Sequence, residues 1–268
     1  MTGRRKLTSL SFDATCSEWW RPGPQVIAHR GASHYAPENT LAAFRLAAEL
    51  GADAVELDAK LSADGVVVVH HDLTLARTTN GFGRLSRRSL SELKALDAGA
   101  KFAPRFAGEP IPTLAEVFEA VGQRLLINVE LTNYENVVDR LVVAVVGLVR
   151  AHELEGRVLF SSFNPFALRA ARRLCPDIPR GLLVGRSQKG WMRAVMRRVT
   201  AFEAYHPQDS MTDRNTIADE HAHGRRVNVW TVDAAERMHE LLLFGCDGLI
   251  TDVPDVAREA VQNVANGR

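Results

Sequence analysis

The sequence predicts an α/β protein with a (β/α)8 barrel, in which eight parallel strands alternate with helices around a closed sheet. Short apolar segments alternate with helix-like segments along the 268 residues, a length that suits one large barrel or two small domains. A doubly wound sheet is the main alternative, but no Gly-x-Gly-x-x-Gly motif follows the first expected strand. The eight expected strands are residues 26–28, 54–59, 125–131, 158–161, 181–184, 201–205, 227–231 and 248–251.

The first unit is a strand, a helix and a strand joined by short connections, which is typical of a parallel crossover. Asn39 or Thr40 is expected to cap the helix, and Gly51 to end it. The second strand carries Glu56 and Asp58, whose side chains point the same way because strand side chains alternate. They belong either to a solvated edge strand or to a cation site, because two adjacent buried carboxylates repel each other.

A small insertion is expected after the second strand. Asp64-Gly65 predicts a hairpin turn into a further strand at 66–69, which leads to His70-His71-Asp72. Residues 73–112 then interrupt the alternation with a short helix, which has a Ser89/Glu92 capping box, and a loop that contains Gly and Pro.

The alternation resumes with a helix that Thr113 and Glu116 are expected to cap. Asp233 with Glu236 is expected to cap a later helix, and Pro254 to open the last one. The other expected helices are residues 137–151, 165–174, 191–199 and 213–222.

Residues 1–24 show no clear period and are expected to form a loose N-terminal arm before a barrel domain at 25–268. The arm lacks the apolar core of an export signal, and no run of roughly 18 apolar residues follows. A cytoplasmic location is therefore expected.

The cysteines Cys16, Cys175 and Cys246 fit neither a disulfide framework nor a zinc pattern and are expected to be reduced. A net charge of +1 gives no global field that would favour nucleic acid as a partner.

Polar residues collect at the expected carboxyl ends of the strands, where a (β/α)8 barrel carries its site. A random scatter of polar residues would not favour the same end of so many strands. These residues are His29, Arg30, Glu56, Asp58, His71, Asn128, Glu130, Ser162, His206, Asn228, Trp230 and Asp252.

The chemistry of these side chains indicates phosphoryl transfer. Glu56, Asp58 and Glu130 converge as oxygen ligands, which favours Mg²⁺, Ca²⁺ or Mn²⁺ over zinc. Imidazole titrates near neutrality, so the two histidines are suited to proton transfer. Arg30 offers a planar fork of donors that matches a phosphate oxyanion.

The sequence resembles the glycerophosphodiester phosphodiesterase family over about residues 25–260. That resemblance implies a (β/α)8 barrel with an insertion after the second strand. The motifs that carry it, in the family's order, are His29-Arg30-Gly31, Pro37-Glu38-Asn39-Thr40, Glu56-Leu57-Asp58, His71-Asp72, Asn128-Val129-Glu130-Leu131, Ser162-Phe163, His206-Pro207, Asn228-Val229-Trp230-Thr231 and Gly248-Leu249-Ile250-Thr251-Asp252.

The resemblance also implies roles for individual residues. His29 and His71 would be the acid/base pair, and one divalent cation, Mg²⁺ or Ca²⁺ with Mn²⁺ as a further candidate, would bind to the metal ligands Glu56, Asp58 and Glu130. The substrate-binding residues would be Arg30 on the phosphate, Glu38 at the metal or glycerol site, and Trp230 as a site wall. The nucleophile is either water or a neighbouring hydroxyl of the substrate's own glycerol. His70 neighbours His71 but is expected to point to the opposite face and to be structural.

One position departs from the family, which often has a lysine two residues after the third carboxylate. This chain has Thr132 there, which leaves its phosphate affinity and its substrate open. Arg186 or Lys189 is a candidate to compensate from a later loop.

The expected activity is hydrolysis of glycerophosphodiesters to an alcohol and glycerol 3-phosphate. The alternatives are a lysophospholipase D and a catalytically silent barrel that binds phosphodiesters, although a binder has no need of both proton-transfer groups.

Residues 189–199 place Trp191, Met192, Val195, Met196 and Val199 on one helical stripe. The favoured interpretation is a barrel helix that packs this stripe inward; the other is weak contact with a membrane surface. The sequence does not indicate an oligomeric state.

Overall fold

The computed structural model describes residues 17–133 and 140–267. Within these ranges, eight parallel strands close into a barrel, because β1 pairs with both β2 and β9. A short antiparallel strand, β3 (Val67–Val69), extends β2 outside the barrel. The expected fold is therefore confirmed. The barrel strands are β1 (Gln25–His29), β2 (Ala54–Leu61), β4 (Leu126–Leu131), β5 (Val158–Ser162), β6 (Arg180–Val184), β7 (Ala204–Pro207), β8 (Arg226–Val229) and β9 (Gly248–Thr251).

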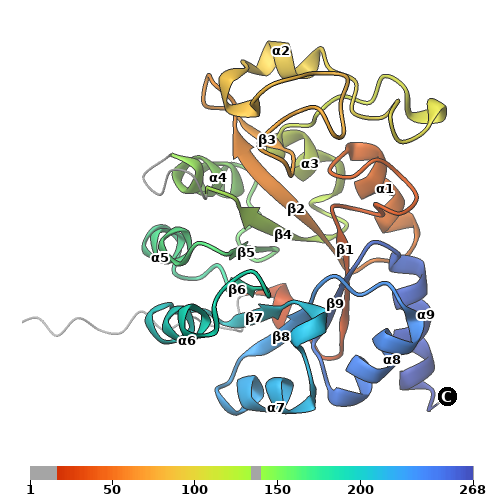
Figure 1. Ribbon diagram of the computed structural model, residues 1–268, viewed down its shortest axis with the longest axis vertical. Coiled ribbons are helices and arrows are strands. Elements are labelled where there is room, and N and C mark those ends of the chain that lie inside the picture. Colours follow the sequence, from red (N-terminus) through yellow and green to blue (C-terminus); the bar gives the residue numbers. More distant parts are fainter. Residues whose placement is uncertain (1–16, 134–139, 268) are drawn as a thin grey trace, which may run out of the picture.

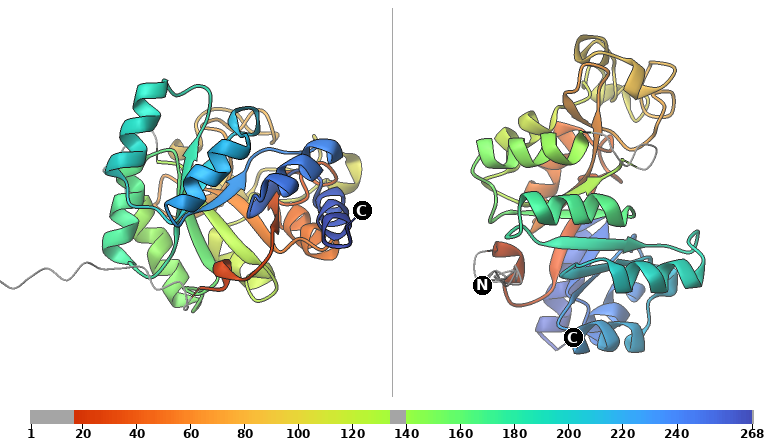
Figure 2. Two further views of the ribbon diagram at one scale, coloured as in Figure 1. Left: turned by 90° about the horizontal axis from the view of Figure 1, so that it is seen from below. Right: turned by 90° about the vertical axis from the view of Figure 1, so that its left-hand side faces the viewer.

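The helices lie around the strands (Figures 1 and 2), and most of them pack their apolar faces on the sheet in one large core, while α6 packs in a separate smaller cluster. Each link between consecutive parallel strands contains one of them, as in a (β/α)8 barrel. They are α1 (Leu41–Glu49), α3 (Leu114–Val121), α4 (Leu141–Ala151), α5 (Pro165–Leu174), α6 (Gly190–Val199), α7 (Arg214–Ala222), α8 (Ala235–Phe244) and α9 (Pro254–Ala265). The expected helix at 137–151 begins outside the described residues.

The insertion lies above β3 at one end of the molecule (Figure 1). It contains α2 (Leu90–Lys94) and two single-turn helices, Leu85–Arg87 and Pro104–Phe106. Its small core joins Val68 of β3 to apolar residues of the insertion itself, which are Leu75, Leu85, Leu93, Ala98 and Ile111.

Most of the predicted caps are confirmed, and one is wrong. Thr40 caps α1, and the Ser89/Glu92 and Thr113/Glu116 capping boxes are both formed. α8 instead begins after Ala234 and has no side-chain cap. The Asp233 side chain instead bonds the end of β9, where its Oδ1 accepts hydrogen bonds from the Thr251 hydroxyl and the Asp252 amide.

The end of the expected N-terminal arm is not loose. Residues 1–16 lie outside the described residues, but Glu18–Trp20 forms a single helical turn, and Trp19 is 1% exposed. The Trp19 indole donates a hydrogen bond to the Arg157 carbonyl at 3.0 Å. Trp19 therefore closes the barrel at the amino-terminal end of the strands, against Ile27, Ala54, Leu126, Leu159, Ala204 and Ile250.

The stripe on α6 does not all pack inward as favoured. Met196 is buried, but Trp191, Val195 and Val199 are 67%, 49% and 67% exposed. The helix rotates its methionines toward α5, β6 and β7 and leaves the larger part of the stripe facing solvent.

In the described part of the chain, none of the helices combines the length and the apolar character that crossing a membrane requires. The cytoplasmic location stays a prediction. Cys175 and Cys246 are buried free thiols, whereas Cys16 lies outside the described residues.

Because Trp19 fills the lower end of the barrel, we expect Trp19→Ala to lower the free energy of unfolding by about 3–5 kcal/mol. Trp191→Ala is the matched control and should change it by no more than about 0.5 kcal/mol, since that side chain is exposed. Guanidinium unfolding followed by circular dichroism measures both. Equal midpoints for the two variants would show that packing of Trp19 against the barrel does not stabilise the fold.

Candidate active site

Three carboxylates meet at the carboxyl end of β2 and β4. Glu56 and Asp58 point inward from β2, and Glu130 stands opposite Asp58 in the register with β4. One oxygen from each lies within 4.8 Å of the others. Glu56 and Asp58 are buried, so the edge-strand interpretation of this pair is wrong.

The charges of this cluster do not balance. Burial, together with the neighbouring charges of Asp58 and Glu130, raises the pKa of Glu56 well above its ordinary value. Burial also opposes ionisation of Asp58, but Arg30, His71 and the Asn39 amide hold the pKa of Asp58 below its ordinary value. The Asn39 Nδ2 donates to Asp58 Oδ2 at 2.8 Å. A bound cation is the direct way to keep all three carboxylates ionised.

The turn after β1 aims Arg30 at this cluster. Arg30 and Gly31 both have positive φ angles, 56° and 85°, and a Cβ at position 31 would lie 2.6 Å from a backbone carbon of Ala43. Only glycine fits there. The Arg30 amide donates to Glu56 Oε2, and its guanidinium lies 3.3 Å from Asp58 Oδ2.

Each of the two predicted catalytic histidines is held by a carboxylate through Nδ1. His29 Nδ1 lies 2.7 Å from Asp252 Oδ1, which also accepts a hydrogen bond from the Ser33 hydroxyl. His71 Nδ1 lies 2.6 Å from Asp72 Oδ1. A carboxylate acceptor places the Nδ1 proton on each ring, so Nε2 is the atom that can exchange a proton with a ligand.

One cavity of about 190 Å³ in the barrel mouth is lined by both histidines, Arg30 and two of the three carboxylates, Glu56 and Glu130. Trp230 and Phe163 form an apolar wall, with their rings edge to face at 5.5 Å. Asn128 is fully buried, and within the described chain neither polar atom of its amide has a hydrogen-bond partner. Such a group is satisfied by water, an ion or a ligand. The lining residues are His29, Arg30, Glu56, His71, Asn128, Glu130, Phe163, Leu183, Trp230 and Ile250.

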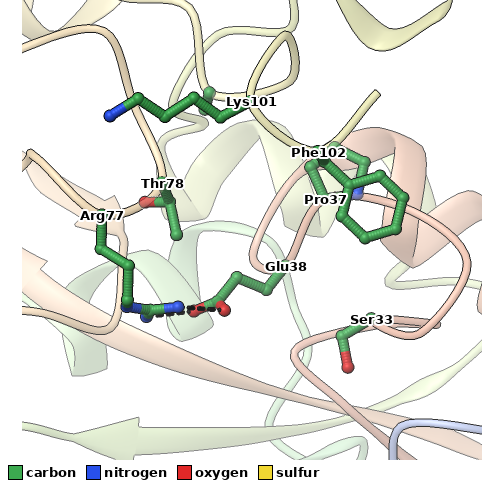
Figure 3. Close-up of a pocket in the computed structure, with 8 residues that line it drawn as sticks. Ser33, Pro37, Glu38, Arg77, Thr78, Lys101 and Phe102 are labelled. Carbon is green, nitrogen blue, oxygen red and sulfur yellow. Dashed lines mark hydrogen bonds and ion pairs between the residues drawn. The ribbon is translucent and has the colours of Figure 1, made fainter. Parts of the chain in front are cut away.

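Glu38 lies outside this cavity and outside the carboxylate cluster. Its carboxylate pairs with Arg30 on one side and with Arg77 on the other, at 3.0 and 2.6 Å. Figure 3 shows the Glu38–Arg77 pair beside a second hollow of about 220 Å³, bordered by Phe102 and Lys101 of the insertion. Glu38 therefore lies between the two hollows, paired with one arginine of each.

Two other histidines near the site, His70 and His206, do not line the cavity and bond protein groups instead. His70 bonds the Thr74 carbonyl through Nε2, away from His71. His206 is fully buried, which lowers its pKa to about 3, and it contacts Asn228 at 3.0 Å. Gly181 makes room for its ring, because a Cβ there would lie 2.6 Å from it.

Three residues of the site had no role assigned from sequence: Asp252, Asp72 and Arg77. Asp252 follows β9, which neighbours β1, so strand order could have paired it with His29. Arg77 holds Asp72 through two hydrogen bonds and comes from the insertion, where no strand periodicity marks it.

Comparison with known proteins agrees with this geometry. The glycerophosphoryl diester phosphodiesterase family matches residues 29–256. A glycerophosphodiester phosphodiesterase from Caldanaerobacter subterraneus subsp. tengcongensis is 42% identical over 86% of this chain and 94% of its own. One from Bacillus subtilis is 30% identical over 86% and 84% of the two chains.

A solved structure points the same way. An Oleispira antarctica phosphodiesterase, determined in complex with its product sn-glycerol-3-phosphate, is 37% identical to this chain and superimposes with a TM-score of 0.81. The match covers 89% of this chain and 97% of that one. With its barrel, its carboxylate cluster and its paired histidines, the chain belongs to the glycerophosphoryl diester phosphodiesterase family.

Proposed function

We propose that this phosphoric diester hydrolase uses one divalent cation and the pair His29/His71 to cleave glycerophosphodiesters into an alcohol and glycerol 3-phosphate. The observation that carries the proposal is the arrangement of both histidines, each fixed at Nδ1 by a carboxylate, on one cavity with Glu56 and Glu130 of the three-carboxylate cluster. A barrel that only binds phosphodiesters would not need two histidines that are each oriented by a carboxylate for proton transfer at Nε2.

Glu56, Asp58 and Glu130 would hold the cation. The all-oxygen ligand set suits Mg²⁺, Ca²⁺ or Mn²⁺. The Asn128 amide, which has no hydrogen-bond partner among the described residues, adds a neutral oxygen on the same cavity. When bound, such a cation withdraws charge from the phosphoryl oxygens as a Lewis acid.

The two histidines divide the proton transfers. One accepts at Nε2 the proton of the attacking group, and the other donates a proton from Nε2 to the oxygen of the leaving alcohol. If the attacking group is water, glycerol 3-phosphate forms directly; if it is the neighbouring glycerol hydroxyl, a cyclic phosphate forms first and water then opens it. Asp252 and Asp72 stabilise the imidazolium form and keep each ring oriented. Arg30 lines the same cavity and contributes a fixed positive charge beside the phosphoryl group.

A second candidate substrate is a lysophospholipid taken from a membrane surface. The exposed side chains of α6, chiefly Trp191, support it, because the helix also carries arginines. Arg169, Arg172 and Arg173 border a hollow next to Val199 and extend the positive charge. An apolar face with a basic rim is typical of contact with an anionic lipid surface.

We expect EDTA to abolish release of choline from glycerophosphocholine, and Mg²⁺, Ca²⁺ or Mn²⁺ to restore it. Glu56→Gln should weaken Ca²⁺ binding by about tenfold or more, because it removes one charged ligand. Binding should also weaken as the pH falls, because the raised pKa of Glu56 lets a proton compete with the cation. Isothermal titration measures the affinity, and the exposed Glu49→Gln is the control. Full activity in the presence of EDTA would refute the requirement for a divalent cation.

We expect His29→Ala and His71→Ala each to lower kcat by about 10²–10⁴-fold, the usual value of general acid–base catalysis. Asp252→Asn should lower kcat less, because His29 keeps its imidazole but loses the carboxylate that orients it. Steady-state kinetics on glycerophosphocholine tests this, with the exposed His223→Ala as control. A variant without His29 that keeps wild-type kcat would rule out the acid/base role.

We expect the protein to co-sediment with vesicles that contain anionic lipid, and Trp191→Ala to weaken this about fivefold or more by removing apolar contact. Phe82→Ala is the control, because Phe82 is 76% exposed on the insertion. No sedimentation with either neutral or anionic vesicles would exclude the membrane surface.

A further inference from the structure

A lysine and a threonine lie two residues beyond the carboxylates, further toward the carboxyl ends of the strands. Lys60 follows Asp58 by two residues on β2, and Thr132 follows Glu130 by two residues along the chain from β4. Asp58 pairs with Glu130 in the register, and Ala59 with Leu131. Since side chains alternate, Lys60 shares the inward face of Asp58, roughly 6–7 Å further toward the carboxyl end.

Thr132 holds Lys60 in place. The Lys60 ammonium donates to Thr132 Oγ1 at 2.9 Å, and that hydroxyl donates its single hydrogen to the Ala59 carbonyl at 2.6 Å. Both residues are buried, with 9% and 6% of their surface exposed. The Thr132 hydroxyl is thus oriented as an acceptor for the Lys60 ammonium. Thr132 therefore positions the charge of Lys60.

The charge of Lys60 acts on the site. Its buried ammonium group is carried on the same face of β2 as Glu56 and Asp58. A divalent cation and Arg30 together bring only as much positive charge as the three carboxylates bring negative charge. A further positive charge on this face favours binding of an anionic phosphodiester, and Lys60 supplies one from β2.

The two other candidates lie elsewhere. Arg186 belongs to the loop after β6, where its guanidinium donates to the Ser210 carbonyl at 2.9 Å. Lys189 is the residue before α6. Neither comes from the strands that carry the three carboxylates.

We propose that Lys60 contacts the phosphoryl oxygens of the substrate and that Thr132 positions it, so that β2 supplies a phosphate-binding cation on the face that carries Glu56 and Asp58. This inference rests on the proposed function, because it assigns a phosphate ligand within the same site. A simpler account is that Lys60 only offsets the carboxylates. In that case its removal tightens cation binding and leaves phosphate affinity unchanged once the cation is saturating.

The test measures binding of glycerol 3-phosphate and of inorganic phosphate by isothermal titration at saturating Ca²⁺. We expect Lys60→Met to weaken glycerol 3-phosphate binding about tenfold or more, because a charge-assisted contact is lost. The double variant Lys60→Met/Thr132→Lys returns the charge from the neighbouring strand and should recover binding to within about threefold of the wild type, since the two changes are coupled. Lys189→Met is the matched control and should bind as the wild type does.

Kinetics with glycerophosphocholine give a second readout. Lys60→Met should raise KM more than it lowers kcat, and Thr132→Val should do so to a smaller extent by releasing the ammonium. Lys60→Gln keeps a polar group at this position and serves if the methionine variant does not fold. Glycerol 3-phosphate affinity within about twofold of the wild type in a folded Lys60 variant would overturn the inference, because a charge-assisted contact contributes more than that. If the wild type binds glycerol 3-phosphate but hydrolyses no diester, the proposed function fails while the Lys60 comparison still stands.

Discussion

The repulsion among Glu56, Asp58 and Glu130 is the constraint on which the rest of the site depends. Three clustered carboxylates, two of them buried, cost more than burial of the same volume of apolar side chains. The surrounding residues are arranged to offset this cost: Arg30 lies against Asp58, Asn39 donates to it, and the Arg30 amide donates to Glu56. A structural role alone does not account for a cluster that needs this much compensation.

The barrel gives this cluster its geometry. The pairing of β2 with β4 sets Asp58 opposite Glu130, and the pairing of β1 with β2 sets His29 beside Glu56. His71 reaches the same cavity from the end of the hairpin strand β3, and its partner Asp72 is fixed by an arginine of the insertion. The insertion therefore contributes to the orientation of one histidine, which links its folding to the chemistry in the barrel.

Strand periodicity and the position of polar residues were enough to predict the fold and the three clustered carboxylates. They work because a strand fixes which side chains share a face, and a closed parallel sheet brings all its carboxyl ends together. Contacts made by loops could not be predicted this way. Glu38 illustrates this, because its pairing with Arg77 depends on the path of the insertion. α6 illustrates a second limit, since its stripe is equally compatible with a buried and an exposed face, and only the packing of Met196 shows which part is inside.

Trp19 bears on where the folded unit begins. The family match starts at residue 29, within the chain but after this side chain. A fragment that started there would lose β1 up to Ala28 as well as the indole that fills the lower end of the barrel. It would present Leu126, Leu159 and Ala204 to water at the opposite end from the active site. Truncation guided by sequence similarity alone would thus convert a closed barrel into one that is open at its base and prone to self-association.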